Sequence, residues 1–171
     1  MDKCYMWHAL QLAKKGVGKV NPNPLVGAVI VKEGKIIGQG YHEMYCKAHA
    51  EVNAFMNLGD EVAEGATMYV TLEPCSHYGK TPPCVNRIIE NKIKRVVIGM
   101  VDPNPLVAGT GVRKLQEAGI DVTVGILEEE CRKLNEVFIK YITEKKPFVV
   151  LKSAMSLDGK IATAKGESKW I

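Results

Sequence analysis

The sequence has no run of apolar residues that approaches the roughly 18 needed to cross a bilayer, so we expect no membrane-spanning helix and no membrane partner. Residues 1–16 follow a helical apolar pattern and lack the continuous apolar core and the cleavage site of a signal peptide. We therefore expect a cytoplasmic protein.

Aromatic side chains and runs of like charge are also scarce. Aromatic residues make up 6% of the chain, and its net charge of +4 is not gathered into a basic stripe. Proteins that bind or edit nucleic acid need a basic face and aromatic rings on which bases stack. We expect no nucleic-acid partner, and the mild positive charge suits an anionic small molecule.

Cysteine is present in an odd number, five, at irregular spacing. A chain of 171 residues that is 46% hydrophobic can build its core without disulfide bonds. This usage indicates a reducing compartment in which thiols are free or bound to metal. We interpret Cys4, Cys46 and Cys131 as bystander thiols.

Apolar periodicity and turn residues predict an α/β fold for residues 1–145. The predicted helices span residues 2–16, 48–59, 84–92, 109–119 and 128–142. The predicted strands span residues 25–31, 36–42, 66–72, 95–101 and 120–126. The first two strands are joined by a short turn, and strands alternate with helices from residue 66 onward. This order predicts a partly parallel sheet with an antiparallel hairpin at one edge.

The pattern restarts after Pro147 with an apolar segment over residues 148–156 that predicts a strand. The last 25 residues are too few to build a core of their own. We interpret residues 147–171 as the truncated N-terminal start of a second domain.

A pattern of metal-binding residues lies in the first domain. His49 and Glu51 open a predicted helix, Cys75 follows a strand, and Cys84 follows Cys75 after eight residues. Zinc favours imidazole and thiolate ligands, and three protein ligands leave the fourth position open for a catalytic water. Zinc makes that water acidic enough to supply hydroxide near neutral pH, and Glu51 is placed to move the protons. A His-x-Glu motif followed by Pro-Cys is typical of zinc-dependent deaminases.

The interval between the two cysteines is longer than the two residues of the general deaminase motif. In order along the whole chain, the segments that resemble the bifunctional deaminase–reductases of riboflavin biosynthesis are NPNPLVGAVIV, HAEVNA, TLEPCSHYGKTPPC, DPNPLVAGTG and LKSAMSLDGKIA. The resemblance implies a cytidine-deaminase-like three-layer α/β/α sandwich with a mixed sheet, followed by the first strand of a dihydrofolate-reductase-like domain. It also implies hydrolytic deamination of 2,5-diamino-6-ribosylamino-4(3H)-pyrimidinone 5′-phosphate to 5-amino-6-(5-phosphoribosylamino)uracil. The complete protein would reduce the ribosyl group with NADPH.

The resemblance implies roles for individual residues. The zinc ligands would be His49, Cys75 and Cys84, with Glu51 as the proton shuttle. The substrate-binding residues would be Asn23, His42, His77, Lys80, Asn104 and, in the reductase fragment, Ser168. The NADPH-binding residues would be Ala154 and Trp170. We further expect a homo-oligomer, and a phosphate cradle formed by Lys80 and the predicted helix that begins near Gly109.

Two other functions stay open at this point. One is a zinc deaminase of another base, such as cytosine, guanine or the adenosine of a tRNA. The other is a non-enzymatic module with a structural zinc, which needs a fourth ligand from Cys46 or a neighbouring histidine. Among the pocket residues, Lys80 could instead be a solvated loop charge, Asn23 a turn cap and His42 a packing residue.

Overall fold

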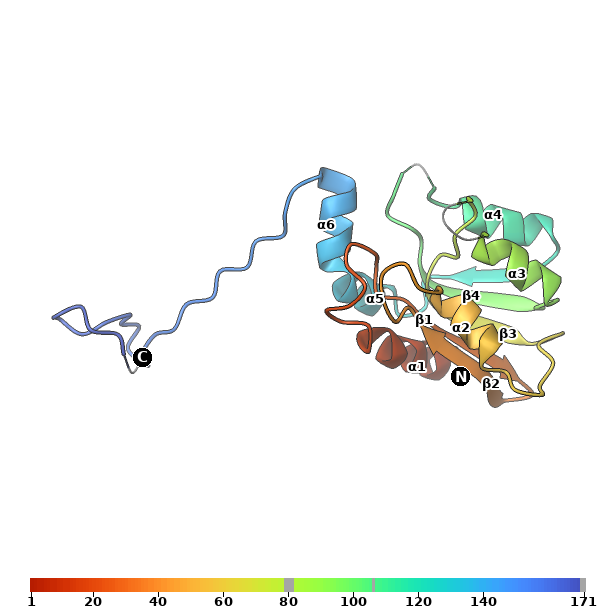
Figure 1. Ribbon diagram of the computed structural model, residues 1–171, viewed down its shortest axis with the longest axis horizontal. Helices are drawn as coiled ribbons and strands as arrows, with labels where there is room; N and C mark the ends of the chain where they lie inside the picture. The colour runs from red at the N-terminus through yellow and green to blue at the C-terminus, as the bar shows by residue number, and fades with distance from the viewer. Residues whose placement is uncertain (79–81, 106, 170–171) are drawn as a thin grey trace.

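The computed structural model of the protein describes residues 1–78, 82–105 and 107–169, and its centre is a five-stranded sheet (Figure 1). The strands are β1 (Gly27–Lys32), β2 (Lys35–Tyr41), β3 (Thr67–Leu72), β4 (Arg95–Met100) and β5 (Asp121–Val124). The helices are α1 (Asp2–Lys14), α2 (Ala50–Met56), α3 (Cys84–Glu90), α4 (Thr110–Glu117), α5 (Glu128–Leu134) and α6 (Glu136–Glu144).

The sheet is mixed, with the strand order β2-β1-β3-β4-β5. β1 runs antiparallel to both β2 and β3, whereas β4 is parallel to β3 and β5 is parallel to β4. The hairpin between β1 and β2 turns at Glu33 and Gly34, whose φ angles of 49° and 79° are those of a tight hairpin turn. The parallel strands are joined through α3 and α4, as parallel pairs require.

Two apolar cores lie on opposite faces of the sheet because successive side chains of a strand point to opposite sides. In β1, Ala28 and Ile30 pack with α2, α3 and α4, whereas Val29 and Val31 pack with α1 and α5. Helices therefore cover both faces of the sheet (Figure 1). The predicted three-layer α/β/α sandwich is confirmed, and among the described residues no helix has the length and apolar content needed to span a bilayer.

The prediction of a single helix over residues 128–142 is wrong. The structure has two helices here, α5 and α6, which meet at Asn135. The backbone of Asn135 leaves the helical region at φ −109° and ψ 18°. Its buried side chain accepts a hydrogen bond from the N–H of Leu25 and donates one to the carbonyl of the same residue. These two bonds to a distant loop explain why the helix changes direction here.

The segment after α6 leads away from the sandwich (Figure 1). The strand predicted over residues 148–156 is not formed, because none of the described residues supplies a partner strand for it. The apolar side chains of Val149 and Leu151 are 81% and 91% exposed. The division of the chain into domains at residues 145–147 stays a prediction.

Candidate active site

The predicted metal-binding residues come from three separate elements that converge beyond the C-terminal end of β3. His49 is the residue that precedes α2, Cys75 lies in the loop after β3, and Cys84 is the first residue of α3. The local sequence contributes to their placement, since Pro74 keeps the chain after β3 from continuing as a strand and Pro83 is the N-cap residue of α3, which begins at Cys84.

The side chains of these three residues face one another. His49 Nδ1 lies 3.6 Å from Cys75 Sγ and 3.3 Å from Cys84 Sγ, and the three ligand atoms lie within 4.8 Å of one another. Zinc–nitrogen and zinc–sulfur bonds of about 2.0–2.3 Å in a tetrahedron place nitrogen and sulfur roughly 3.5 Å apart. The observed separations fit a zinc ion, and His49 would bind it through Nδ1.

Hydrogen bonding and burial shift the pKa values of the two thiols in opposite directions. Cys75 accepts hydrogen bonds from the Cys84 side chain, from His49 and from the backbone N–H of Cys84, and these bonds lower its pKa. The hydrogen bond to Cys75 and burial together raise the pKa of Cys84. A cation at this position would favour the thiolate form of both, as a coordinated thiol is deprotonated.

Glu51 lies in the first turn of α2, next to this cluster, and is 4% exposed. Burial raises its pKa to about 7, with a further contribution from the negative charge of Cys75 and an opposing one from His49. A carboxyl group that titrates near neutral pH is suited to both accept and return a proton.

The cluster opens into a cavity of about 440 Å³, within the range typical of small-molecule sites. Besides His49, Glu51 and Cys75, four predicted pocket residues line it: Asn23, His42, His77 and Asn104. The structure therefore brings these predicted residues together with the metal cluster, and their individual roles stay predictions.

The hydrogen bonds of His42 define what Asn23 offers to the cavity. The Ala48 carbonyl lies 3.0 Å from His42 Nδ1 and can only accept, so Nδ1 carries a proton. Burial lowers the pKa of His42, which favours the neutral ring, and Nε2 therefore accepts a hydrogen bond from Asn23 Nδ2 at 3.0 Å. The Asn23 amide is thus held with its nitrogen toward His42 and its oxygen as an available acceptor.

The arrangement can be compared with known proteins. A sequence model described as the cytidine and deoxycytidylate deaminase zinc-binding region matches residues 1–100. The chain belongs to this family. A second model, described as the RibD C-terminal domain, matches residues 147–171 of this deaminase-family chain.

The similarity of the chain to its relatives extends over its full length. It is 60% identical to the riboflavin biosynthesis protein RibD of Aquifex aeolicus, and the match covers 100% of this chain and 48% of that protein. It thus spans about half the length of the curated relatives it matches. The resemblance to the riboflavin-pathway deaminase–reductases is confirmed.

Solved structures are similar to the chain as well, and two of them serve as examples. One is a diaminohydroxyphosphoribosylaminopyrimidine deaminase/5-amino-6-(5-phosphoribosylamino)uracil reductase from Thermotoga maritima, with 56% identity, a TM-score of 0.95 and coverage of 99% of this chain and 49% of that one. The other is the Aspergillus oryzae Rib2 deaminase in complex with DARIPP, with 27% identity, a TM-score of 0.65 and coverage of 84% and 95%.

Several of the predicted site residues are not among the described residues that line the cavity. Lys80 and Trp170 fall outside the described residues. Ala154 and Ser168 are exposed in the segment after α6, and neither lines the cavity. Cys46 lines the cavity but is not a member of the three-residue metal cluster among the residues described, so the structure gives no support to a fourth thiolate ligand.

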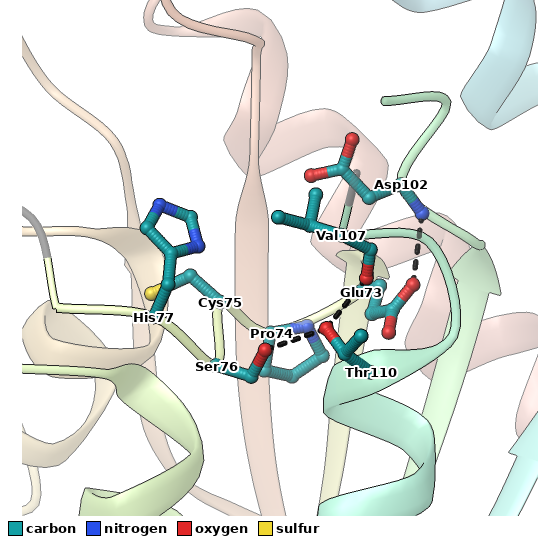
Figure 2. A pocket seen from close by; sticks show the side chains of 8 residues that line it. All are labelled: Glu73, Pro74, Cys75, Ser76, His77, Asp102, Val107 and Thr110. Carbon is teal, nitrogen blue, oxygen red and sulfur yellow. Dashed lines mark hydrogen bonds between the residues drawn. The ribbon is translucent and has the colours of Figure 1, made fainter. Parts of the chain in front are cut away.

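The prediction of a phosphate cradle at the start of α4 is wrong, because a side chain of the protein already fills this position. The N–H groups of Gly109, Gly111 and Val112 all donate to the carboxylate of Glu73, and that of Thr110 donates to the Val107 carbonyl. Figure 2 shows the Glu73 carboxylate between the start of α4 and Asp102. A phosphate would have to displace an internal anion.

Sequence reasoning missed Glu73, although an acidic residue directly after an apolar strand is a signal of a buried, hydrogen-bonded carboxylate. It also missed Lys47 and two apolar residues of α6, Phe138 and Ile142, which line the cavity. The α6 residues could not be placed from the sequence, because their position depends on the change of direction at Asn135.

Proposed function

We propose that this chain catalyses the zinc-dependent hydrolytic deamination of 2,5-diamino-6-ribosylamino-4(3H)-pyrimidinone 5′-phosphate to 5-amino-6-(5-phosphoribosylamino)uracil in riboflavin biosynthesis. The observation that carries the proposal is the position of Glu51, buried beside His49, Cys75 and Cys84 at one cavity. The similarity to riboflavin-pathway proteins along the full chain supports the choice of substrate.

The chemistry requires water to add to the ring carbon that carries the amino group, followed by loss of ammonia. Zinc, when bound, makes water acidic enough to react near neutral pH. Glu51 accepts a proton from the attacking water and returns it to the departing amino group. Its burial keeps bulk water away, and its raised pKa matches this double role.

The polar groups of the cavity suit the edge of a pyrimidinone. Asn23 offers its amide oxygen to a ring donor, and Asn104 adds a second amide to the cavity lining. A site built to hydrogen-bond such an edge rejects analogues that lack it, since the polar groups of the site would be left unpaired.

The substrate phosphate requires a cation. Because Glu73 occupies the start of α4, the cationic side chains proposed for the phosphate are Lys47, which lines the cavity, and Lys80. Lys80 remains part of the proposal from the sequence alone, since it lies outside the described residues.

We also propose that the full-length protein reduces the ribosyl group with NADPH, with Ala154 and Trp170 at the cofactor and Ser168 at the substrate. The match of residues 147–171 to the RibD C-terminal domain supports this. The exposed apolar side chains of Val137 and Tyr141 on α6 support assembly into a homo-oligomer. A cytoplasmic location remains part of the proposal.

The experiment that tests the proposed deamination measures ammonia release by the zinc-loaded chain from the pyrimidinone phosphate, from cytidine and from guanine. We expect turnover of the pyrimidinone phosphate with a kcat/KM at least about a hundredfold above that for the other two, as hydrogen-bonded recognition provides. Comparable or faster turnover of cytidine or guanine would favour the alternative of a deaminase of another base. No turnover of any of the three would contradict both.

A further inference from the structure

Glu73 is a buried carboxylate held by four backbone N–H groups. It directly follows β3 and is 5% exposed. Its Oε2 accepts hydrogen bonds from Asp102 and Gly109, both at 3.0 Å. Its Oε1 accepts hydrogen bonds from Gly111 at 2.8 Å and from Val112 at 3.1 Å. Both oxygens are thus saturated by the backbone, and the positive end of α4 compensates the charge.

The two bonds to Oε2 come from the two ends of one loop. Asp102 begins the loop that follows β4, and Gly109 ends it at the start of α4. Asn104, which lines the cavity, lies between them, and its N–H donates to Asp102 Oδ1 at 2.8 Å. A single oxygen atom therefore closes the base of the loop that carries Asn104, a residue of the cavity lining. Figure 2 shows the bond from Asp102 to Glu73.

The same side chain is only two residues from Cys75 in the chain. On the other side of Cys75, Ser76 Oγ lies 2.6 Å from Thr110 Oγ1, and Lys114 Nζ donates to the Ser76 carbonyl at 2.6 Å. The segment that carries the metal-binding cysteine is therefore bound to α4 both before and after that cysteine.

The close approach of α4 to this segment leaves little room for adjustment. A Cβ atom added to Gly111 would lie 2.3 Å from the carbonyl oxygen of Pro74, so only glycine allows this contact. With the helix this close, the direction of the Glu73 side chain determines where the loop from Asp102 to Gly109 begins and ends.

We propose that Glu73 is a positioning residue for substrate binding: its carboxylate fixes the loop that carries Asn104 against the segment that carries Cys75. This inference rests on the proposed deamination. Glu73 does not touch the reacting atoms in this role, and it is not one of the three residues of the metal cluster. Its loss weakens the binding of substrate more than the chemical step.

The test uses the zinc-loaded 171-residue chain with Glu73→Gln. The glutamine side chain has nearly the same shape, but its NH2 group faces two N–H donors, so one pair of the four bonds is lost. We expect amide hydrogen exchange at Asp102, Gly109, Gly111 and Val112 to speed up about tenfold or more, with amides of β1 and β4 unchanged. KM for the pyrimidinone phosphate should rise about tenfold, with kcat within about threefold and zinc content unchanged.

Two further variants make the test specific. Glu64→Gln is the matched control, because Glu64 is an exposed glutamate whose partner among the described residues is Lys92 at the surface, and its kinetics should equal those of the wild type. Combining Glu73→Gln with Asn104→Ala tests the route of the effect. If Glu73 acts through Asn104, KM of the double variant equals that of Asn104→Ala alone.

Val112→Pro replaces one of the four N–H donors with a ring Cδ that crowds Glu73 Oε1, so it breaks the same link without changing Glu73 and serves as the test should Glu73→Gln fail to fold. The N–H of Val112 bonds Glu73 and not the helix, so proline is tolerated at this position. We expect a rise in KM of about threefold.

The inference is overturned by faster amide exchange in Glu73→Gln with an unchanged KM, by a loss confined to kcat or to zinc, or by additive effects in the double variant. An unchanged KM in Val112→Pro also overturns it. Wild-type turnover is measured first. A wild type that releases no ammonia overturns the proposed function and this inference with it. If the wild type is active and KM of Glu73→Gln equals that of the wild type, the inference alone is overturned.

Discussion

The side chain of Asn135 exchanges two hydrogen bonds with the backbone of Leu25, 110 residues away in the sequence. Asn135 accepts from the Leu25 N–H at 2.8 Å and donates to the Leu25 carbonyl at 3.0 Å. Leu25 follows the proline-rich loop that presents Asn23, so this pair ties the cavity loop to the junction of α5 and α6.

Replacing Asn135 by leucine should lower the free energy of unfolding by about 2–4 kcal/mol, because two backbone groups of Leu25 lose their partners in a buried place. Urea denaturation measures the loss. The control is Asn91→Ala, since among the described residues the half-buried Asn91 side chain bonds the Arg87 carbonyl of the helix it follows, and its cost should stay below about 1 kcal/mol. Equal costs for the two variants would contradict the bracing role.

Cys84→Ser should lose zinc and activity together, because serine is a poor zinc ligand and the remaining two ligands do not close a site. Elemental analysis of the purified protein and ammonia release measure the two losses. Cys4→Ser is the control, since Cys4 is exposed on α1, and it should keep both. Cys46→Ser should also keep its zinc, and a loss of metal there would indicate a fourth thiolate ligand.

Glu51→Gln should keep the fold and the zinc but lose deamination by about a hundred- to ten-thousandfold in kcat, the usual range for a general acid–base group. The amide neither accepts the proton of the attacking water nor returns it to the departing amine. Single-turnover kinetics of the zinc-loaded variant measure the chemical step. Activity within a few-fold of the wild type would exclude the proton-shuttle role.

Asp2 anchors α1 to the sheet through a charged pair whose contribution depends on pH. Arg95 donates two hydrogen bonds to its carboxylate, at 2.9 and 3.2 Å, and the Tyr69 hydroxyl donates a third at 2.8 Å. The bond from Arg95, followed by that from Tyr69, lowers the pKa of Asp2. The stabilisation is therefore present above the pKa of the unfolded chain and is lost as the pH falls through the lower pKa of the folded state.

Asp2→Asn should lower the free energy of unfolding of the zinc-free chain by about 1 kcal/mol at pH 7, since the pair is partly exposed. The difference from the wild type should shrink between about pH 5 and pH 3. Thermal denaturation at several pH values measures this trend, with Asp60→Asn on an exposed turn as the control. A difference that does not change with pH would show that packing of α1, and not the charge, is responsible.

Lys47→Ala and Lys80→Ala should each raise KM for the pyrimidinone phosphate by about tenfold and leave kcat nearly unchanged, because a phosphate partner far from the reacting carbon contributes to binding alone. Lys92→Ala is the matched control, since Lys92 is exposed in the turn after α3 and pairs with Glu64. Steady-state kinetics with the phosphorylated and dephosphorylated substrate decide the case. If the ratio of variant KM to wild-type KM is the same for the phosphorylated and the dephosphorylated substrate, the two lysines are excluded as phosphate partners.

The sequence predicts each strand of the sheet to within two residues at either end, because every strand combines an apolar run with flanking turn residues. It also places His49 and Glu51 on one helix start, since their spacing is local. That Cys75 and Cys84 would meet His49 followed from a motif and not from periodicity. The strands and the helix start depend on neighbours in the chain, which is why the sequence reveals them.

The features that the sequence does not reveal depend on distant partners. The change of direction at Asn135 requires Leu25, and the start of α4 is filled by Glu73 from the end of β3. Glycine-rich helix starts look alike whether they bind an external phosphate or an internal carboxylate, so the pattern alone could not distinguish them. The apolar segment over residues 148–156 has the composition of a strand, but a strand forms only with a partner.

β3 is the middle strand of the five and leads directly to Glu73 and Cys75. For protein engineering this divides the molecule into two zones of very different tolerance. Insertions and fusions at the edge strand β5 leave Glu73 and Cys75 in place, whereas the edge strand β2 packs closely against α2, which carries Glu51. Any change that shifts β3 along its neighbours moves the metal-binding loop and the support of α4 in the same step, so a library built on this fold gains most when that strand is kept constant.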